Sequence, residues 1–177
     1  AISVVLLTTL IGAGQGLFLA LFTVQCYALV GLLSPPGHGF YAWGSAIAFV
    51  LLIAGLLASF FHLGRPERAW RTATMWRTSW LSREVIVLPA FMGLLVLWLA
   101  AHATGRGPTL AIGALAALAA IALFVCTGMI YACIRFLREW ATPLTPINFT
   151  LLGCANGFTL AAAIAAPAAP APSTSAL

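Results

Sequence analysis

The chain has 177 residues, of which 63% are hydrophobic and 6% are charged, and its mean hydropathy is +1.08. Soluble globular domains carry about 25% charged residues, so the composition excludes a soluble domain. The basic residues, all Arg, outnumber the acidic ones and give a formal net charge of +5. No basic stripe lies on a soluble face, so we expect the charge to orient membrane spans and expect no nucleic-acid partner.

A membrane crossing needs about 20 apolar residues, so the chain has room for five or six spans and no soluble domain. We therefore predict an all-α integral membrane protein, a bundle of about five transmembrane helices. The expected spans lie near residues 3–33, 41–62, 83–103, 110–134 and 147–166. Between them, residues 63–82 are rich in Arg and Trp and are expected at the membrane interface, and residues 167–177 form a Pro/Ala-rich tail.

The first expected span carries an amide, Gln15, within the segment GAGQG. An amide in hydrocarbon must find a hydrogen-bond partner, either on another helix or in a bound polar ligand. Gly12 and Gly16 have the spacing that lets another helix approach closely. A dinucleotide-binding loop is not expected, because no strand precedes these glycines.

A polar segment from Phe61 to Glu84 interrupts the apolar sequence and contains five of the eight arginines and His62. His62 ends one span and Glu84 begins the next on the same membrane face. A titratable imidazole and a carboxylate suit a quinone headgroup, whose reduction takes up two protons. The alternative is that His62 is an interfacial or capping residue and that Glu84 pairs with Arg83 or Arg65.

The third span is expected to begin with Ser82 as its cap, which places Glu84 in the first turn. Haem binding is not expected: His62 and His102 fall at opposite membrane faces, and His38 lies in a turn opposite His62. Cysteines are expected to be packing residues, because their spacing fits neither a zinc site nor an iron-sulfur cluster. They are Cys26, Cys126, Cys133 and Cys154.

With five spans, the start of the chain and the loops after the second and fourth spans share one face. That face carries seven arginines, and the opposite face carries Arg106. The positive-inside rule places the arginine-rich face in the cytoplasm.

Three segments carry a resemblance to a known family: FHLGRPERAWR, RTSWLSREV and TPLTPINFTLLGCANGF. Together they resemble the membrane-anchor subunit of the dimethyl sulfoxide reductase family, including the anchors of cytoplasmic sulfite dehydrogenases. The resemblance covers nearly the whole chain. It implies a non-catalytic, haem-free subunit in the inner membrane of a bacterium, which binds menaquinone or ubiquinone. It also implies two partners, an iron-sulfur subunit and a molybdopterin catalytic subunit.

The resemblance assigns the quinone site to His62, with Glu84 as its acidic neighbour. Gln15 is a further candidate for the pocket, and Arg65 is a candidate both for the site and for holding the docked partner. The other candidates for contact with the partner or with anionic lipid are Arg68, Arg71 and Arg77.

Family members have about eight spans, so this chain is either a short form or the first part of an eight-helix anchor. The arginine-rich face favours a cytoplasmic catalytic side, and therefore sulfite oxidation over sulfoxide reduction. Two alternatives stay open: a small solute transporter, although the sequence shows no internal repeat, and a purely structural anchor without a quinone site.

Overall fold

The structure, a computed structural model, describes residues 2–60, 71, 74–134 and 137–166. Five helices account for most of these residues: α1 (Ile2–Leu29), α2 (His38–Phe60), α3 (Trp80–Thr104), α4 (Thr109–Ala132) and α5 (Leu144–Ala165). All five are long and apolar enough to cross a membrane. The predicted all-α bundle of five spans is confirmed.

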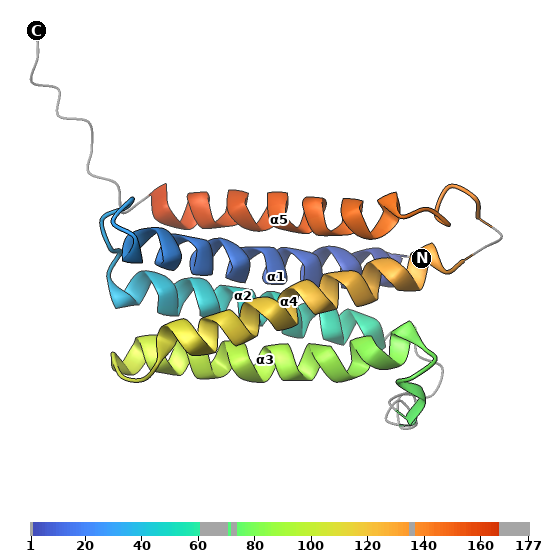
Figure 1. Ribbon diagram of the computed structural model, residues 1–177, viewed down its shortest axis with the longest axis horizontal. Helices are drawn as coiled ribbons and strands as arrows, with labels where there is room; N and C mark the ends of the chain where they lie inside the picture. The colour runs from blue at the N-terminus through green and yellow to red at the C-terminus, as the bar shows by residue number, and fades with distance from the viewer. Residues whose placement is uncertain (1, 61–70, 72–73, 135–136, 167–177) are drawn as a thin grey trace, which may run out of the picture.

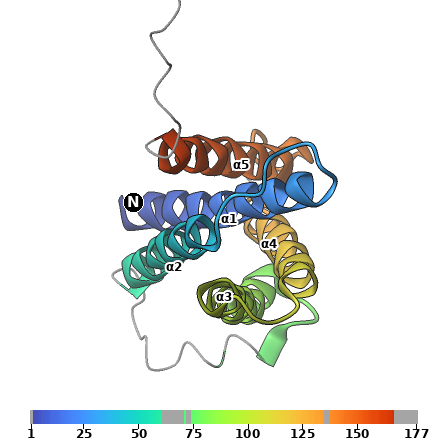
Figure 2. The same ribbon diagram turned by 90° about the vertical axis from the view of Figure 1, so that its left-hand side faces the viewer.

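Successive helices run in opposite directions, so the connections lie at two ends of the bundle (Figure 1). The start of α1, the start of α3 and the α4–α5 connection lie at one end, which we call the arginine-rich end because its described residues include Arg77, Arg83 and Arg138. The opposite end holds the α1–α2 and α3–α4 connections. Seen along the bundle, α1 lies between α5 on one side and α2, α3 and α4 on the other (Figure 2).

The structure ends α1 at Leu29, earlier than the expected span. Gly31 adopts a positive φ of 77° and reverses the chain. The amides of Val30 and Leu32 then bond back to the carbonyls of Cys26 and Tyr27, at 3.1 and 3.0 Å. Glycine tolerates this left-handed conformation, so the sequence SPPG follows the helix end rather than making it.

The start of α3 differs from the prediction by one turn. Ser79, not Ser82, is the cap: its hydroxyl accepts a bond from the Ser82 amide at 3.4 Å, and Trp80 begins the helix. Ser82 is buried inside the first turn. Glu84 consequently lies one turn deeper than expected, about 6 Å along α3 from Trp80 at about 1.5 Å per residue.

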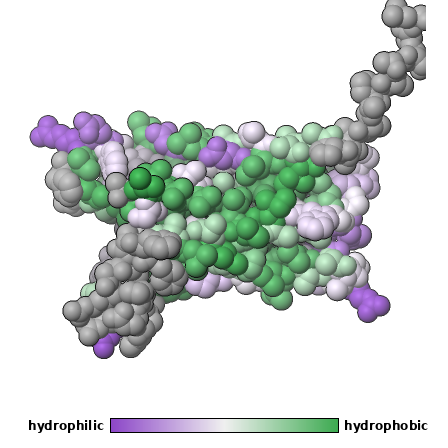
Figure 3. All heavy atoms as spheres, turned by 180° about the vertical axis from the view of Figure 1, so that it is seen from behind, coloured by the Kyte–Doolittle hydropathy of each residue, from purple (hydrophilic) through white to green (hydrophobic). Residues whose placement is uncertain are grey.

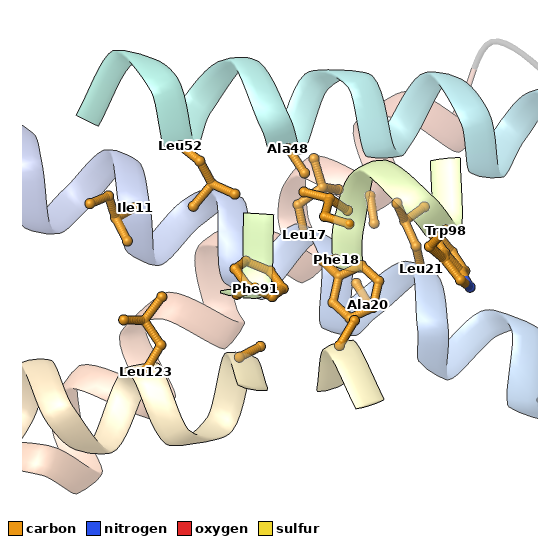
Figure 4. Close-up of a cluster of buried hydrophobic side chains, with 14 of the residues drawn as sticks. Ile11, Leu17, Phe18, Ala20, Leu21, Ala48, Leu52, Phe91, Trp98 and Leu123 are labelled. Atoms are coloured by element: carbon orange, nitrogen blue, oxygen red, sulfur yellow. The ribbon is translucent and has the colours of Figure 1, made fainter. Parts of the chain in front are cut away.

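Large side chains from α1 and α3 fill the centre of the bundle (Figure 4). The Phe18 ring meets Phe91 and Trp98 edge-on, with ring centroids 5.5 and 5.2 Å apart. The indole Nε1 of Trp98 donates to the Thr109 carbonyl at 3.0 Å, which satisfies the polar edge of an otherwise buried ring. Within lipid, such close packing is the main attraction between helices.

Glycines bring α1 and α5 together. A Cβ added at Gly16 would clash with the Gly153 backbone, and one added at Gly157 would clash with the backbone of Gly16 and Leu17. The expected close approach at Gly16 is therefore confirmed, and its partner is the glycine pair of α5.

The lateral surface is apolar between the two ends. The face in Figure 3 is mainly hydrophobic at its middle and strongly hydrophilic at its ends, as expected for a bundle surrounded by lipid. Hydrophilic side chains also lie over α5, where Asn148 and Asn156 are exposed. Amides on a lipid-facing surface indicate a site or a contact at α5.

Candidate functional site

A cavity of about 650 Å³ lies between α1, α4 and α5, with Glu84 contributed by α3. It extends from the arginine-rich end into the bundle. Its walls combine apolar side chains with a few polar groups, the usual make-up of a ligand site. The polar groups on its walls are Thr8, Thr9, Gln15, Glu84, Thr127, Tyr131, Glu139, Thr145, Asn148 and Asn156.

Gln15 marks the inner part of the cavity. It lies about 20 Å along α1 from Ile2, at about 1.5 Å per residue. Its side chain is 1% exposed, and its amide nitrogen Nε2 has no hydrogen-bond partner among the described residues. A buried amide without a partner costs free energy, so a ligand with an acceptor oxygen would stabilise this arrangement.

Glu84 lies nearer the arginine-rich end, on the second turn of α3. Its carboxylate oxygen Oε1 accepts a 2.6 Å hydrogen bond from the Thr127 hydroxyl on α4. The bond links two helices across the cavity wall. It also fixes one carboxylate oxygen.

Arg83, the expected alternative partner of Glu84, is used differently. Its guanidinium donates to the carbonyls of Trp76 and Arg77, each at 3.0 Å, and lies 4.2 Å from the centre of the Trp80 ring. Arg83 therefore fastens the segment before α3 to the start of that helix. Arg65, the other possible partner, lies outside the described residues.

Aromatic rings and an exposed carboxylate form the mouth of the cavity. Tyr131 stacks on Phe149 with ring centroids 5.1 Å apart and meets Trp140 edge-on at 5.4 Å. Glu139, which is exposed, precedes Trp140 and also lines the cavity. Water at the arginine-rich end can therefore reach a carboxylate on the cavity wall.

One side of the cavity opens at the lateral surface of the bundle, between α1 and α5. The lining residues Val5 and Leu152 are 62% and 66% exposed, and Asn148 and Asn156 are exposed beside Leu152. A ligand with an apolar tail could lie across this opening while a polar headgroup occupies the interior.

The structure brings two of the four predicted site residues, Gln15 and Glu84, to one cavity. His62 and Arg65 lie outside the described residues. Sequence reasoning missed Thr127, which carries no signal because a threonine in a helix commonly bonds its own backbone. Asn148 and Asn156 are polar residues in the apolar sequence of α5, but the sequence does not predict which side of the helix faces the cavity.

At the opposite end, His38 and His102 meet, which the sequence analysis did not expect. Their Nδ1 atoms are 3.3 Å apart, and His102 also packs against Tyr41 and Trp98 with ring centroids 4.5 Å apart. His38 is the first residue of α2 rather than part of a turn, which explains the contact. Over the described residues, no three His, Cys, Asp or Glu side chains gather into a metal-binding group.

The fold and this cavity define a multi-pass helical membrane protein with a polar-lined cavity at one membrane face. The sequence model of the DMSO reductase anchor subunit (DmsC) family matches residues 1–176. The chain belongs to this family of membrane-anchor subunits, as its motifs predicted.

Two curated relatives match the chain. It is 58% identical to a sulfite dehydrogenase subunit from Allochromatium vinosum, over 94% of this chain and 55% of that protein. It is 31% identical to the anaerobic dimethyl sulfoxide reductase protein YnfH of Escherichia coli, over 82% of this chain and 56% of that protein. The chain thus spans about half the length of these relatives. No solved structure matches it.

Proposed function

We propose that the chain is the membrane anchor of a quinone-linked sulfite dehydrogenase complex and that the cavity between α1, α4 and α5 binds the quinone headgroup. The main support is the buried amide nitrogen of Gln15, which has no hydrogen-bond partner among the described residues and lies on the wall of a cavity that also contains Glu84. The relative with 58% identity is named as a sulfite dehydrogenase subunit, which favours sulfite over a sulfoxide as the substrate.

The chemistry of the cavity residues fits a quinone. An oxidised ring presents two carbonyl acceptors, and a reduced ring presents two hydroxyl donors. The Gln15 amide can donate and accept, and Glu84 accepts as a carboxylate and donates as an acid. Apolar walls such as Ile11 and Phe124, with the opening between α1 and α5, suit an isoprenoid tail.

A bound quinone would supply two-electron, two-proton redox chemistry. Gln15 orients the ring from the inner end of the cavity. Glu84 holds or releases a proton at its carboxyl oxygens, and Thr127 keeps that carboxyl group in place. The family resemblance adds His62 to the site, and Arg65 is a further candidate; both lie outside the described residues.

The proposed partners dock at the arginine-rich end. An iron-sulfur subunit there would carry electrons between the quinone and a molybdopterin catalytic subunit, so this chain is a non-catalytic subunit. The excess of arginine favours a cytoplasmic location for that end, in the inner membrane of a bacterium.

Quinone binding by the purified complex tests the proposal. A short-chain ubiquinone and a short-chain menaquinone are titrated, and quenching of tryptophan fluorescence reports binding because Trp140 lies on the cavity wall. Gln15→Leu is expected to weaken binding about tenfold, since losing this hydrogen bond costs about 1.4 kcal/mol, within the usual range.

The matched control is Gln25→Leu. Gln25 is a buried glutamine on the same helix, but its amide donates to Thr109 at 2.9 Å near the opposite end. The Gln25→Leu variant should leave the affinity for quinone unchanged. Equal affinities for the wild type and Gln15→Leu would contradict the proposed cavity. An assembled His62→Ala complex with intact quinol-linked electron transfer would contradict the role of His62 and favour a structural anchor.

A further inference from the structure

Two carboxyl groups lie on the wall of one cavity, Glu84 inside the bundle and Glu139 at the mouth. We infer that Glu139 is the group through which Glu84 exchanges protons with water at the arginine-rich end. This inference rests on the proposed function, in which Glu84 serves as a proton carrier. It assigns Glu139 a role that neither the motifs nor the predicted site residues included.

Glu84 needs such a route because it is only partly accessible. It lies one turn inside α3, and its partner among the described residues is the Thr127 hydroxyl. Its neighbour Arg83 bonds to the Trp76 and Arg77 carbonyls instead. Arg83 therefore does not form an ion pair that would stabilise the charged form of the Glu84 carboxyl group.

Other polar side chains line the same cavity as the two carboxyl groups. Thr127 and Tyr131 lie one helical turn apart on α4, and Asn148 faces the same cavity from α5, with Thr145 beside the mouth. A buried water needs two to four polar partners, and these hydroxyl and amide groups supply them. A hydroxyl can also accept from a protonated carboxyl group as readily as it donates to a carboxylate.

Among the described residues, few competing charges line the route. On α1 the facing polar residues, Thr8, Thr9 and Gln15, do not titrate. The titratable groups among the described cavity residues are Glu84, Glu139 and Tyr131. Arg138 precedes Glu139, is exposed, and is not part of the cavity wall.

The proton balance is simple. Each proton that leaves the Glu84 carboxyl group toward the cavity is replaced by one that enters from water at Glu139, so both side chains end in their starting state. The direction reverses when protons are released. Electrons follow a separate route to the partner subunit and do not pass through either carboxyl group.

Hydrogen–deuterium exchange of the Glu84 carboxyl group tests the route without any quinone. The complex in lipid is transferred to D₂O at a pH at which Glu84 is protonated, and infrared spectroscopy follows the carboxyl band that Glu84→Gln removes. Glu139→Gln is expected to slow this exchange about tenfold or more, and Glu139→Asp should restore much of the rate.

Arg138→Gln is the matched control, since it alters the neighbouring exposed charge and leaves the cavity wall intact. Slower exchange in Glu139→Gln but not in Arg138→Gln supports the route. An unchanged rate in Glu139→Gln, or equal slowing in both variants, overturns it. Quinone titration of the same samples is independent: a failure to bind quinone refutes the proposed function and leaves the exchange result interpretable.

Discussion

Trp98 joins four helices near the opposite end of the bundle. Its ring contacts Phe18 and Tyr41, and its Nε1 donates to the Thr109 carbonyl. Trp98→Phe would leave that carbonyl without its donor and open space in a region where the side chain is 0% exposed. We expect a loss of about 2–3 kcal/mol in the free energy of unfolding, measured in detergent.

The control for this substitution is Trp43→Phe, at a position that is 72% exposed. It changes the same functional group on the outer surface, so stability should change by less than about 0.5 kcal/mol. Equal effects of the two substitutions would mean that Trp98 does not fasten the helices together.

Among individual residues, the sequence predicted the polar groups that are costly to bury, but not the neighbouring side chains that contact them or share their cavity. Gln15 and Glu84 stood out because amides and carboxylates are rare within apolar spans. Thr127 and Tyr131 did not, because a hydroxyl next to an apolar helix face has no distinctive pattern. Their roles depend on which helices are adjacent, and helix adjacency is a tertiary property.

The crossing of α1 and α5 depends on glycine. Gly157→Ala would push the Gly16 and Leu17 backbone away, since backbone atoms cannot rotate aside as a side chain can. The two helices would separate, and the adjacent cavity would change shape. We expect Gly157→Ala to lower the free energy of unfolding by about 1–3 kcal/mol and to weaken quinone binding.

Gly93→Ala on α3 provides the comparison, because an added Cβ there meets nothing within 4 Å. Alanine favours a helix over glycine by about 1 kcal/mol, so this variant should be neutral or more stable. Thermal unfolding measures the stability of both variants, and quinone titration measures their affinity for quinone. If Gly157→Ala matched Gly93→Ala, the close helix contact would be irrelevant to stability.

At the element scale, composition and hydropathy were sufficient to predict five helices, because each span must be long and apolar. The helix ends were less predictable. The first span was expected to reach residue 33 and Ser82 to cap the third, yet the chain turns at Gly31 and Ser79 caps α3. Several residues near each end can cap or turn the chain, and tertiary contacts decide among them.

The described arginines of the bundle are divided between its two ends, which makes the orientation of the whole molecule testable. Thr78 and Thr104 are exposed at the arginine-rich and opposite ends, respectively. In a background without the four native cysteines, Thr104→Cys should react with a membrane-impermeant maleimide added to intact spheroplasts. Thr78→Cys should react only after lysis, because the positive-inside rule places that end in the cytoplasm.

Both substitutions replace a threonine and leave the charge unchanged, so neither alters the arginine distribution that sets the orientation. The reverse labelling pattern would place the arginine-rich end outside the cytoplasm. The partner subunits would then be expected on the outer side.

The opening beside Val5 and Leu152 decides which concentration unit describes ligand binding at this site. A ligand that enters there comes from the hydrocarbon phase, so occupancy follows its mole fraction in the bilayer rather than its bulk concentration. Diluting a fixed amount of ligand with extra lipid should lower occupancy even when the sample volume is constant. Titrations at different lipid-to-protein ratios should therefore coincide only when plotted against ligand per lipid.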